Sequence, residues 1–289
     1  MQIIERLDQI DANYDALLVD LWGCLHNGVA PFPSAVAALQ SFRARGGAVC
    51  LLTNAPRSRQ EVEKHLNAMG LPEDCWDTIA TSGDSARVAM YSGAVGQKIW
   101  FIGEPGDEPF FERMALMENA PEITRVPLKD AEGIICTGPF DRTADPNEMR
   151  PQFLMAKQMG LKLLCANPDI VVDRGERREW CAGALAALYT EMGGESLYFG
   201  KPHPPVYDLA RRRLAEVGKP ADPSRTLAIG DGIATDIQGA LGEDIDSLFI
   251  TGGLAASETG TAEQPDPVKL DAFLTGQLVT PTFSIGRLR

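Results

Sequence analysis

Four short segments, far apart in the sequence, carry side chains that can act on a phosphate ester. They are LLVDLWGCLHNG (residues 17–28), VCLLTNAP (49–56), FGKPHP (199–204) and LAIGDGIATDIQGA (227–240). The first, second and fourth begin as apolar, β-rich runs and end in a small or acidic residue. Open parallel sheets build active sites where such strands end. Two acidic segments, a lysine and a Thr-Asn pair then provide the groups that a magnesium-assisted phosphoryl site needs.

The first two segments supply a nucleophile and contacts to phosphate. Asp20 ends an apolar run directly before a turn, and a carboxylate there can attack phosphorus and form an acyl-phosphate. In the second segment, the Thr53 hydroxyl, the Asn54 amide and nearby backbone N–H groups can hold phosphoryl oxygens. Each of these residues also has a purely structural interpretation, because such side chains often only cap a turn.

The other two segments supply charge of both signs. Lys201 lies in a loop bounded by glycine and proline, where its ammonium can neutralise the nucleophile and the transferring phosphoryl group. The alternative for Lys201 is a solvated surface lysine. Asp231 and Asp236 straddle a small-residue turn into a helix, and two acids after a buried strand suit a hard cation that keeps several waters. Asp236 can equally cap that helix.

The elements that must position these side chains alternate between strands and helices. PFPSAVAALQSFRARGG (31–47) predicts a helix with Ser34 as its N-cap, and the strand AVCLLTNA (48–55) follows at once. SRQEVEKHLNAMG (58–70) predicts a second helix, capped by Ser58. This alternation implies parallel strands joined by right-handed crossovers, and therefore an α/β fold.

A second α/β stretch lies between the second and third segments. Strand patterns occur in KIWFIGE (98–104), AEGIICTGPF (131–140) and LKLLCANPD (161–169); helical patterns occur in PGDEPFFERMALMENA (105–120), PNEMRPQFLMAKQMG (146–160) and REWCAGALAALYTEMGG (178–194). Because this block has its own rhythm, we predict an inserted α/β cap domain over residues 86–191. The core domain then consists of residues 1–85 and 192–289.

Composition excludes several classes of partner. The 289-residue chain has a formal net charge of −13, which argues against a nucleic acid or an acidic membrane surface. No apolar run reaches the roughly 18 residues of a membrane span, and the N-terminal segment lacks the basic and apolar regions of a signal peptide. The six cysteines show no CxxC spacing, so we expect reduced, buried thiols in a cytoplasmic protein.

Taken together, the four segments resemble the haloacid dehalogenase (HAD) superfamily. Asp20 matches its nucleophile, Thr53 its second motif, Lys201 its third, and Asp231 with Asp236 its fourth. TSGDSARVAMYS, KIWFIGE, ANPD and FGKPHPPVYDLA further resemble subclass IIA, the 4-nitrophenylphosphatase and NagD-like group. The resemblance covers nearly the whole chain. It implies a Rossmann-like core with a large inserted cap, Mg²⁺ as cofactor, a small phosphorylated substrate and a homodimer formed through the caps.

The sequence departs from the phosphatase pattern at Trp22. Members of the family have a second Asp two residues after the nucleophile, which protonates the leaving group and then activates water. Indole cannot do either, and loss of general acid–base help typically costs about 10²–10⁴-fold in rate. The resemblance still implies a metal site, because the family uses the backbone carbonyl at this position, beside Asp20 and Asp231, as a ligand. His26 is a weak candidate for the missing acid and base.

The cap is expected to shape the substrate pocket. Asn167 and Asp169 close an apolar strand, and in the resembled group this part of the cap faces the core. We expect both residues to contact substrate. Arg174, Arg177 or Arg178 can bind a second anionic group, or can instead form a solvated charge run whose members pair with one another.

Three functions fit these residues. The first is a Mg²⁺-dependent phosphatase that acts on a small phosphorylated metabolite, a sugar phosphate or a nucleotide, through an aspartyl-phosphate intermediate. The second is a phospho-ligand binding or regulatory protein in which Trp22 has removed turnover. The third is a dehalogenase-like acyl-enzyme hydrolase, since the dehalogenases of the superfamily carry Tyr at the position of Trp22. The paired acids Asp231 and Asp236 favour the metal-dependent phosphoryl chemistry over the third.

Overall fold

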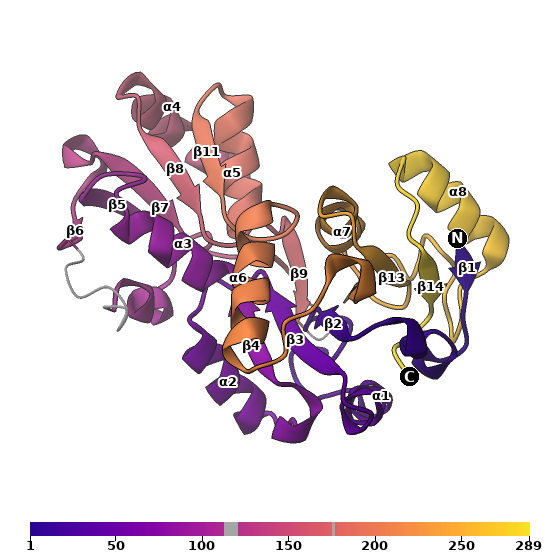
Figure 1. The fold of residues 1–289 in the computed structure, drawn as a ribbon. Helices are drawn as coiled ribbons and strands as arrows, with labels where there is room; N and C mark the ends of the chain where they lie inside the picture. Colours follow the sequence, from indigo (N-terminus) through magenta and orange to yellow (C-terminus); the bar gives the residue numbers. More distant parts are fainter. Residues whose placement is uncertain (113–120, 175–176) are drawn as a thin grey trace.

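The largest sheet of the molecule is parallel throughout and carries all four motif segments at or near one edge (Figure 1). The computed structural model describes residues 1–112, 121–174 and 177–289. The seven strands lie in the order β1 (Gln2–Ile3), β14 (Phe283–Ile285), β13 (Asp246–Ile250), β12 (Thr226–Gly230), β2 (Ala16–Val19), β3 (Ala48–Thr53) and β4 (Thr78–Thr81). Consecutive pairs in this order are parallel. The expected α/β core is therefore confirmed.

The central strands are apolar on both sides because helices cover both faces of the sheet. Leu17 and Val19 of β2 pack into one hydrophobic cluster, whereas Leu18 packs into another on the opposite face. Helices α1 (Pro33–Ala44), α2 (Arg59–Ala68), α7 (Gln238–Gly242) and α8 (Pro267–Gln277) each come after a core strand along the chain, and α6 (Pro204–Glu216) packs against β3 and β4. Burial on both faces fixes the strands, and so fixes where their carboxyl ends point.

A second parallel sheet occupies the middle of the chain. Its strands lie in the order β11 (Glu195–Tyr198), β8 (Lys162–Cys165), β7 (Gly133–Cys136), β5 (Lys98–Ile102) and β6 (Thr124–Arg125). Helices α4 (Arg150–Gln158) and α5 (Ala182–Glu191) follow β7 and β8. β11 lies beyond residue 191, where the predicted cap ends, so we propose a cap that extends to the end of β11. The preceding boundary at residue 85 falls inside α3 (Ser82–Tyr91), which links the two sheets.

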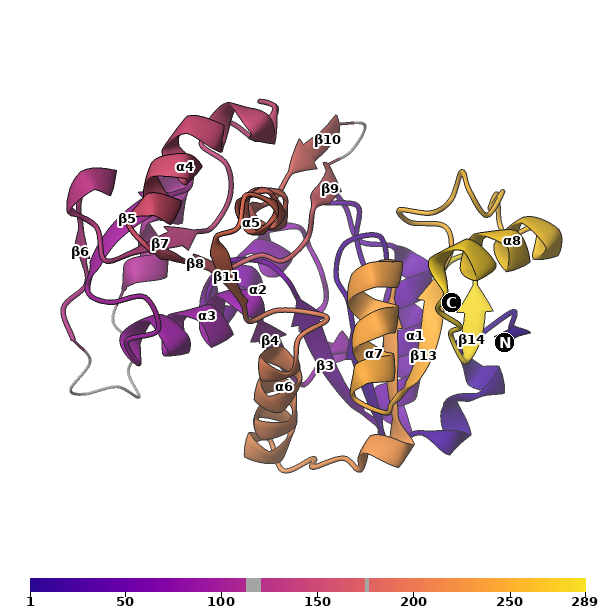
Figure 2. The same ribbon diagram turned by 90° about the horizontal axis from the view of Figure 1, so that it is seen from above.

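A small hairpin projects from this second sheet toward the core. β9 (Val171–Arg174) pairs antiparallel with β10 (Arg177–Trp180), and Figure 2 shows the pair standing apart from the cap helices. The predicted helix over residues 178–194 was wrong at its start, because Trp180 pairs with Val171 and α5 begins only at Ala182. The alanine-rich run alone carries the helix.

Of the two predicted N-cap residues, Ser58 is confirmed and Ser34 is not. Ser58 caps α2 as predicted, and Glu61 completes a capping box. Ser34 was wrong as a cap: α1 begins at Pro33, and the Ser34 hydroxyl instead donates a hydrogen bond to the Leu288 carbonyl at 2.9 Å. Residues 105–111 form a 3₁₀ helix, whereas most of the remainder of the predicted helix over residues 105–120 lies outside the described residues.

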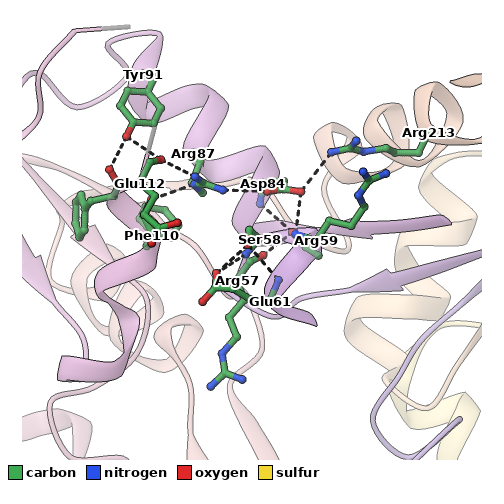
Figure 3. A network of polar contacts seen from close by, with 12 residues as sticks. Arg57, Ser58, Arg59, Glu61, Asp84, Arg87, Tyr91, Phe110, Glu112 and Arg213 are labelled. Carbon is green, nitrogen blue, oxygen red and sulfur yellow. Dashed lines mark hydrogen bonds and ion pairs between the residues drawn. The ribbon is translucent and has the colours of Figure 1, made fainter. Parts of the chain in front are cut away.

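A buried ion-pair network, hereafter the junction network, joins core and cap at the start of α3 (Figure 3). The Asp84 carboxylate accepts hydrogen bonds from Arg87 at 3.3 Å and Arg213 at 3.4 Å, and from the backbone N–H of Arg59 at 3.2 Å. Arg87 also donates to the carbonyls of Phe110 and Glu112, in the segment that follows β5. The network therefore ties α2, α3 and α6 to the first part of the cap.

All six cysteines are buried and unpaired, as expected. Within the described residues, no helix combines the length and the apolar character needed to cross a membrane.

Candidate active site

The motif residues meet at the carboxyl edge of the seven-stranded sheet. β2 lies between β3 and β12, and Val19 is in register with Leu51 and Ile229. Asp20 directly follows β2, Thr53 ends β3 and Asp231 directly follows β12. Three neighbouring strand ends thus bring together residues that are far apart in sequence, as the α/β pattern predicts.

Lys201 links the first motif to the last. Its ammonium lies 2.6 Å from Oδ1 of Asp20 and 2.6 Å from Oδ1 of Asp236. The lysine is only 2% exposed, so it is not the solvated surface residue that its loop sequence also allowed. Burial opposes its charge, but Asp20 and Asp236 outweigh this and raise the pKa of Lys201 well above its usual value. Lys201 is therefore a fixed cation beside the candidate nucleophile.

Asp231 lies in a close-fitting backbone pocket. Its Oδ2 accepts a hydrogen bond from the Leu254 N–H at 2.9 Å. A Cβ at Gly23 or Gly253 would lie 2.1 Å or 2.0 Å from the same oxygen, so both positions need glycine. Gly23 also has φ of +73°, a conformation in which glycine is favoured. The Gly253 contact was missed from the sequence; its signal is the Gly-Gly pair directly after an apolar strand.

Asp236 is held by its own turn. It lies in a short π-helical turn, Ile233–Ile237, that leads into α7, and its Oδ2 accepts from the Gly232 N–H at 3.0 Å. The carboxylate therefore contacts the backbone of this turn and Lys201 at once; because Asp236 lies inside the turn, it is not the N-cap of the helix.

Together these four side chains form a buried group with unbalanced charge, hereafter the acidic cluster: Asp20, Lys201, Asp231 and Asp236. Burial, followed by repulsion from the other two acids, raises the pKa of Asp231 well above its usual value. Burial also raises the pKa of Asp236 to about 6 and raises that of Asp20, although Lys201 lowers both in part. Three buried carboxyls facing one ammonium leave negative charge that a cation would offset.

The donor set fits a hard divalent cation. Oxygens of Asp20 and Asp231 and the Cys24 sulfur all lie within 4.8 Å of one another. Burial raises the pKa of the Cys24 thiol well above its usual value, and a protonated thiol is a poor ligand. The Trp22 carbonyl accepts no hydrogen bond from any residue that the structure describes, so it remains available to a cation. Carboxylate and carbonyl oxygens are the ligands that Mg²⁺ prefers.

Asn54 is used differently from the prediction. Its Oδ1 accepts from the Lys201 N–H at 2.7 Å, and its Nδ2 donates to Asp169 at 2.8 Å and to the Lys201 carbonyl at 3.1 Å. With both ends of the amide engaged and the residue 2% exposed, Asn54 positions Lys201 and Asp169 rather than holding substrate itself. Thr53, by contrast, lines a cavity next to Asp20.

The two predicted cap residues reach this edge of the core. Asn167 and Asp169 line the same cavity as Asp20, and the Asn167 side chain accepts from the Asp169 N–H at 3.0 Å. Burial raises the pKa of Asp169, whereas Lys201 and Asn54 lower it in part. The Asn54–Asp169 hydrogen bond crosses from core to cap, so the cap closes directly over the acidic cluster.

Asp20 and Trp22 both line two cavities. One, of about 320 Å³, contains Asp231, Asp236 and Lys201; the other, of about 270 Å³, contains Thr53 and Asn167. The Trp22 ring is partly buried and packs against Gly28, where a Cβ would lie 2.2 Å from the indole. It therefore forms a wall where the second Asp of the phosphatase pattern would otherwise project.

His26 does not offer a replacement acid at neutral pH. It is 1% exposed, and its Nδ1 accepts a hydrogen bond from the Gly28 N–H at 3.0 Å. Burial, followed by repulsion from His65, lowers the pKa of His26 to about 4. The imidazole is therefore neutral, and it packs edge-on against Trp22 with ring centroids 5.1 Å apart.

Sequence reasoning missed a group of basic side chains in the smaller cavity. Arg57, His65 and Arg142 line it together with Arg174, which was a candidate. Arg57 follows the second motif by only four residues, and its basic character next to LLTNAP was the available signal.

Comparisons with known proteins identify the family of this chain. Residues 17–116 match the family of haloacid dehalogenase-like hydrolases, and residues 198–273 match a second family described as HAD-hydrolase-like. A solved structure from Brucella suis 1330, a hydrolase of the haloacid dehalogenase-like family, is 36% identical with a TM-score of 0.85. The match covers 99% of this chain and 100% of that one.

Two curated relatives are more distant. The D-glycerol 3-phosphate phosphatase of Mycobacterium tuberculosis is 25% identical over 93% of this chain and 71% of its own length. The 5'-nucleotidase YutF of Bacillus subtilis is 24% identical over 91% of this chain and 96% of its own length. The chain therefore belongs to the haloacid dehalogenase-like hydrolases, and the second sheet between its second and third motifs is the arrangement that the resemblance to subclass IIA predicts.

Proposed function

We propose that this protein is a Mg²⁺-dependent phosphatase that hydrolyses a small phosphorylated metabolite through an aspartyl-phosphate. The observation that carries the proposal is the contact of Lys201 with both Asp20 and Asp236 at 2.6 Å. Asp20 also lies close to Asp231, and these two carboxylates fit a hard cation. The names of the two curated relatives, a glycerol phosphate phosphatase and a nucleotidase, support the same substrate class.

In this proposal Asp20 is the nucleophile. A carboxylate oxygen of Asp20 forms a bond to phosphorus while the ester P–O bond breaks and the leaving oxygen departs with the bonding electrons. Lys201 keeps Asp20 ionised and offsets the charge of the phosphoryl group, and the Thr53 hydroxyl holds a phosphoryl oxygen. Asp20, Asp231 and the Trp22 carbonyl would hold Mg²⁺, which would supply further positive charge for the phosphoryl oxygens. A water oxygen then forms a bond to phosphorus while the P–O bond to Asp20 breaks; inorganic phosphate leaves, the proton of the water passes to phosphate or solvent, and the Asp20 carboxylate is restored.

The leaving group decides how well this site turns over. With Trp22 in place of the second Asp, and His26 neutral and accepting from Gly28, the leaving oxygen takes its proton from water, from the substrate itself or from a cap residue such as Asp169, whose pKa is raised by burial. Substrates with acidic leaving groups are therefore hydrolysed best. The same observation favours the second function, a phospho-ligand binding protein, if the physiological leaving group is a simple alcohol.

Hydrolysis of 4-nitrophenyl phosphate tests the proposal, because nitrophenolate needs little protonation. We expect activity that requires Mg²⁺, is lost in chelator and falls by roughly 10⁴-fold or more in Asp20→Asn. Asp8→Asn is the matched control, since Asp8 is an exposed acid that pairs with Arg6. Equal activity in Asp20→Asn and the wild type contradicts the proposed nucleophile. Absence of activity in the wild type, with phosphate and Mg²⁺ still bound, selects the binding protein.

A further inference from the structure

The smaller cavity beside Asp20 is lined by more arginines than carboxyls, which are Asp20 and Asp169, and the phosphoryl chemistry does not use these arginines. Asp20, Thr53 and Trp22 lie in its lining together with three arginines and a histidine: Arg57, Arg142, Arg174 and His65. The arginines come from core and cap, so the cavity is closed from both sides. In a chain of net charge −13, a cavity lined in this way is a local exception.

Arg57 is the core contribution, and its guanidinium is uncommitted. Its backbone is fixed, since its carbonyl accepts from the Thr81 hydroxyl at 2.7 Å and Gly83 packs against it. Within the described parts of the chain, no carboxylate lies within salt-bridge distance of this side chain. Figure 3 shows the guanidinium pointing away from the junction network, with no contact drawn to it.

Arg174 is the cap contribution, at the end of β9. It stands over the Trp22 ring, with Cζ 6.0 Å from the ring centroid. Its ion pair with Glu179 is long, at 3.6 Å, and Glu179 is shared with Arg142 at 4.0 Å. Arg142 has its own partner, Glu104, at 3.0 Å. Of the three arginines, Arg57 and Arg174 are therefore the two whose guanidiniums lack a close carboxylate partner among the described residues.

His65 reports the same excess. It lies on α2 at the rim of the cavity, and its pKa is lowered by burial and then by the positive charges of Arg57 and Arg174. Two guanidiniums thus lie near enough to one imidazole to disfavour its protonated form. A neutral imidazole can still donate one hydrogen bond to an anion.

We propose that Arg57 and Arg174 bind a second anionic group, a carboxylate or a phosphate, on the leaving-group side of the substrate. The proposal rests on the proposed phosphatase function and names its substrate class: phosphomonoesters that carry a further negative charge a few bonds from the ester. Guanidiniums bind carboxylate and phosphate oxygens in a planar, bidentate manner. Trp22 acquires a role here, because the ring that replaces an acid also supports Arg174.

Matched substrate pairs test this class. 3-Phosphoglycerate differs from glycerol 3-phosphate by a carboxylate in place of CH₂OH, and fructose 1,6-bisphosphate differs from fructose 6-phosphate by a second phosphate. In at least one pair, we expect the wild type to prefer the compound with the second anionic group. A preference for 3-phosphoglycerate indicates a carboxylate subsite, and a preference for fructose 1,6-bisphosphate indicates a phosphate subsite. In Arg57→Gln and Arg174→Gln we expect this preference in kcat/KM to fall by about 10- to 100-fold, mainly through KM.

Lys64→Gln is the control, since it removes an exposed positive charge next to His65 but outside the cavity lining. It should keep the wild-type preference. Equal losses on both members of each pair in the arginine variants, or no preference in the wild type, would overturn the proposal. Circular dichroism melting of each variant separates loss of fold from loss of the subsite.

A binding measurement distinguishes failure of the proposed phosphatase function from failure of the proposed subsite. If the wild type hydrolyses none of these esters or 4-nitrophenyl phosphate, calorimetric titration with the same four compounds still decides the subsite. If the compound with the second anionic group binds more tightly and this advantage is lost in Arg57→Gln, the subsite is supported even though the protein does not turn over substrate. Equal binding of both partners overturns it.

Discussion

Two buried clusters of charge in this molecule are balanced in opposite ways. In the acidic cluster three carboxyls share a single ammonium; burial, followed by repulsion between the carboxyls, raises the pKa values of Asp231 and Asp236. In the junction network one carboxylate, Asp84, meets two guanidiniums, and Arg87 has backbone carbonyls as further acceptors (Figure 3). Both clusters lie beyond the carboxyl end of a strand of the same sheet.

This difference indicates that the acidic cluster is a candidate ligand site, whereas the junction network is structural. Asp84, Arg87 and Arg213 each pair with a side chain of opposite charge, so the network can stabilise the joint between core and cap. The acidic cluster is left with negative charge, and a protein keeps such an imbalance where a ligand offsets it. Substitutions in the two clusters should therefore affect different properties.

The largest expected effect follows from adding a further acid to the acidic cluster. Trp22→Asp supplies the missing general acid, so hydrolysis of glycerol 3-phosphate should rise by roughly 10²–10⁴-fold. Hydrolysis of 4-nitrophenyl phosphate should change far less, because its leaving group needs no proton. Steady-state kinetics on both substrates, with Trp22→Leu as the control that removes the ring without adding an acid, measure this. An equal gain in Trp22→Leu contradicts the assignment.

Removing the cation of the acidic cluster should mainly affect the rate. Lys201→Met removes one preorganised charge, for which a loss of roughly 10²–10³-fold in kcat is expected. Arg87→Met removes a buried cation from the junction network instead and should change kcat little. The two variants assayed side by side with 4-nitrophenyl phosphate sharpen the comparison. If both lost activity equally at a temperature where both are folded, the clusters would not differ as described.

Removing the acid of the junction network should mainly affect stability. Asp84→Asn leaves Arg87 buried without a carboxylate and leaves Arg213 only its pair with Glu216, which should lower the free energy of unfolding by about 3–5 kcal/mol. Urea denaturation followed by circular dichroism measures the change. A loss below about 1 kcal/mol would show that the backbone carbonyls of Phe110 and Glu112 satisfy Arg87 and that Glu216 satisfies Arg213.

The smallest expected effect is a gain in the free energy of unfolding, in contrast to the loss expected for Asp84→Asn. In chelator, Asp231→Asn should be more stable than the wild type at pH 7.5, on the order of 1 kcal/mol, because it replaces a carboxyl whose ionised form is disfavoured in the folded state by burial and then by its acidic neighbours. The pKa of Asp231 is raised in the folded state, so the folded wild type holds a proton that the unfolded chain releases. The penalty therefore grows as pH rises above the ordinary carboxyl range, and the advantage of the variant should shrink toward pH 5.

Comparing the two proteins at each pH removes the contribution of His26. Its lowered pKa gives both proteins the same opposite trend, stability that rises as pH passes from about 4 to 6.5, so it cancels in the difference. A difference that stays constant with pH would show that Asp231 titrates normally.

The parts of the site that the sequence predicts are those set by a single strand and the residue after it. Asp20, Thr53 and Asp231 each follow or end an apolar run, and parallel pairing then brings them together. The sequence also predicts the α/β class and the Ser58 cap, because both depend on local pattern.

The remaining features depend on contacts between segments that no local pattern specifies. Asn54 is engaged by Lys201 and Asp169, which are more than a hundred residues away, so its use in positioning could not be read from a Thr-Asn turn. The convergence of Arg57 and Arg174 requires the β9–β10 hairpin, whose second strand had been interpreted as helix because it runs into α5. β11 was left out of the cap because four residues after a helix carry too little pattern to assign a strand to one sheet or another.

The most direct test of the difference between the clusters is thermal unfolding during titration with Mg²⁺, at constant ionic strength. The account predicts that saturating Mg²⁺ raises the Tm of the wild type by roughly 5 °C and that Asp84→Asn shows the same rise from a lower starting point. Asp231→Asn should show none. An equal rise in Asp231→Asn would contradict the central claim, since the acidic cluster would then not be where the cation binds.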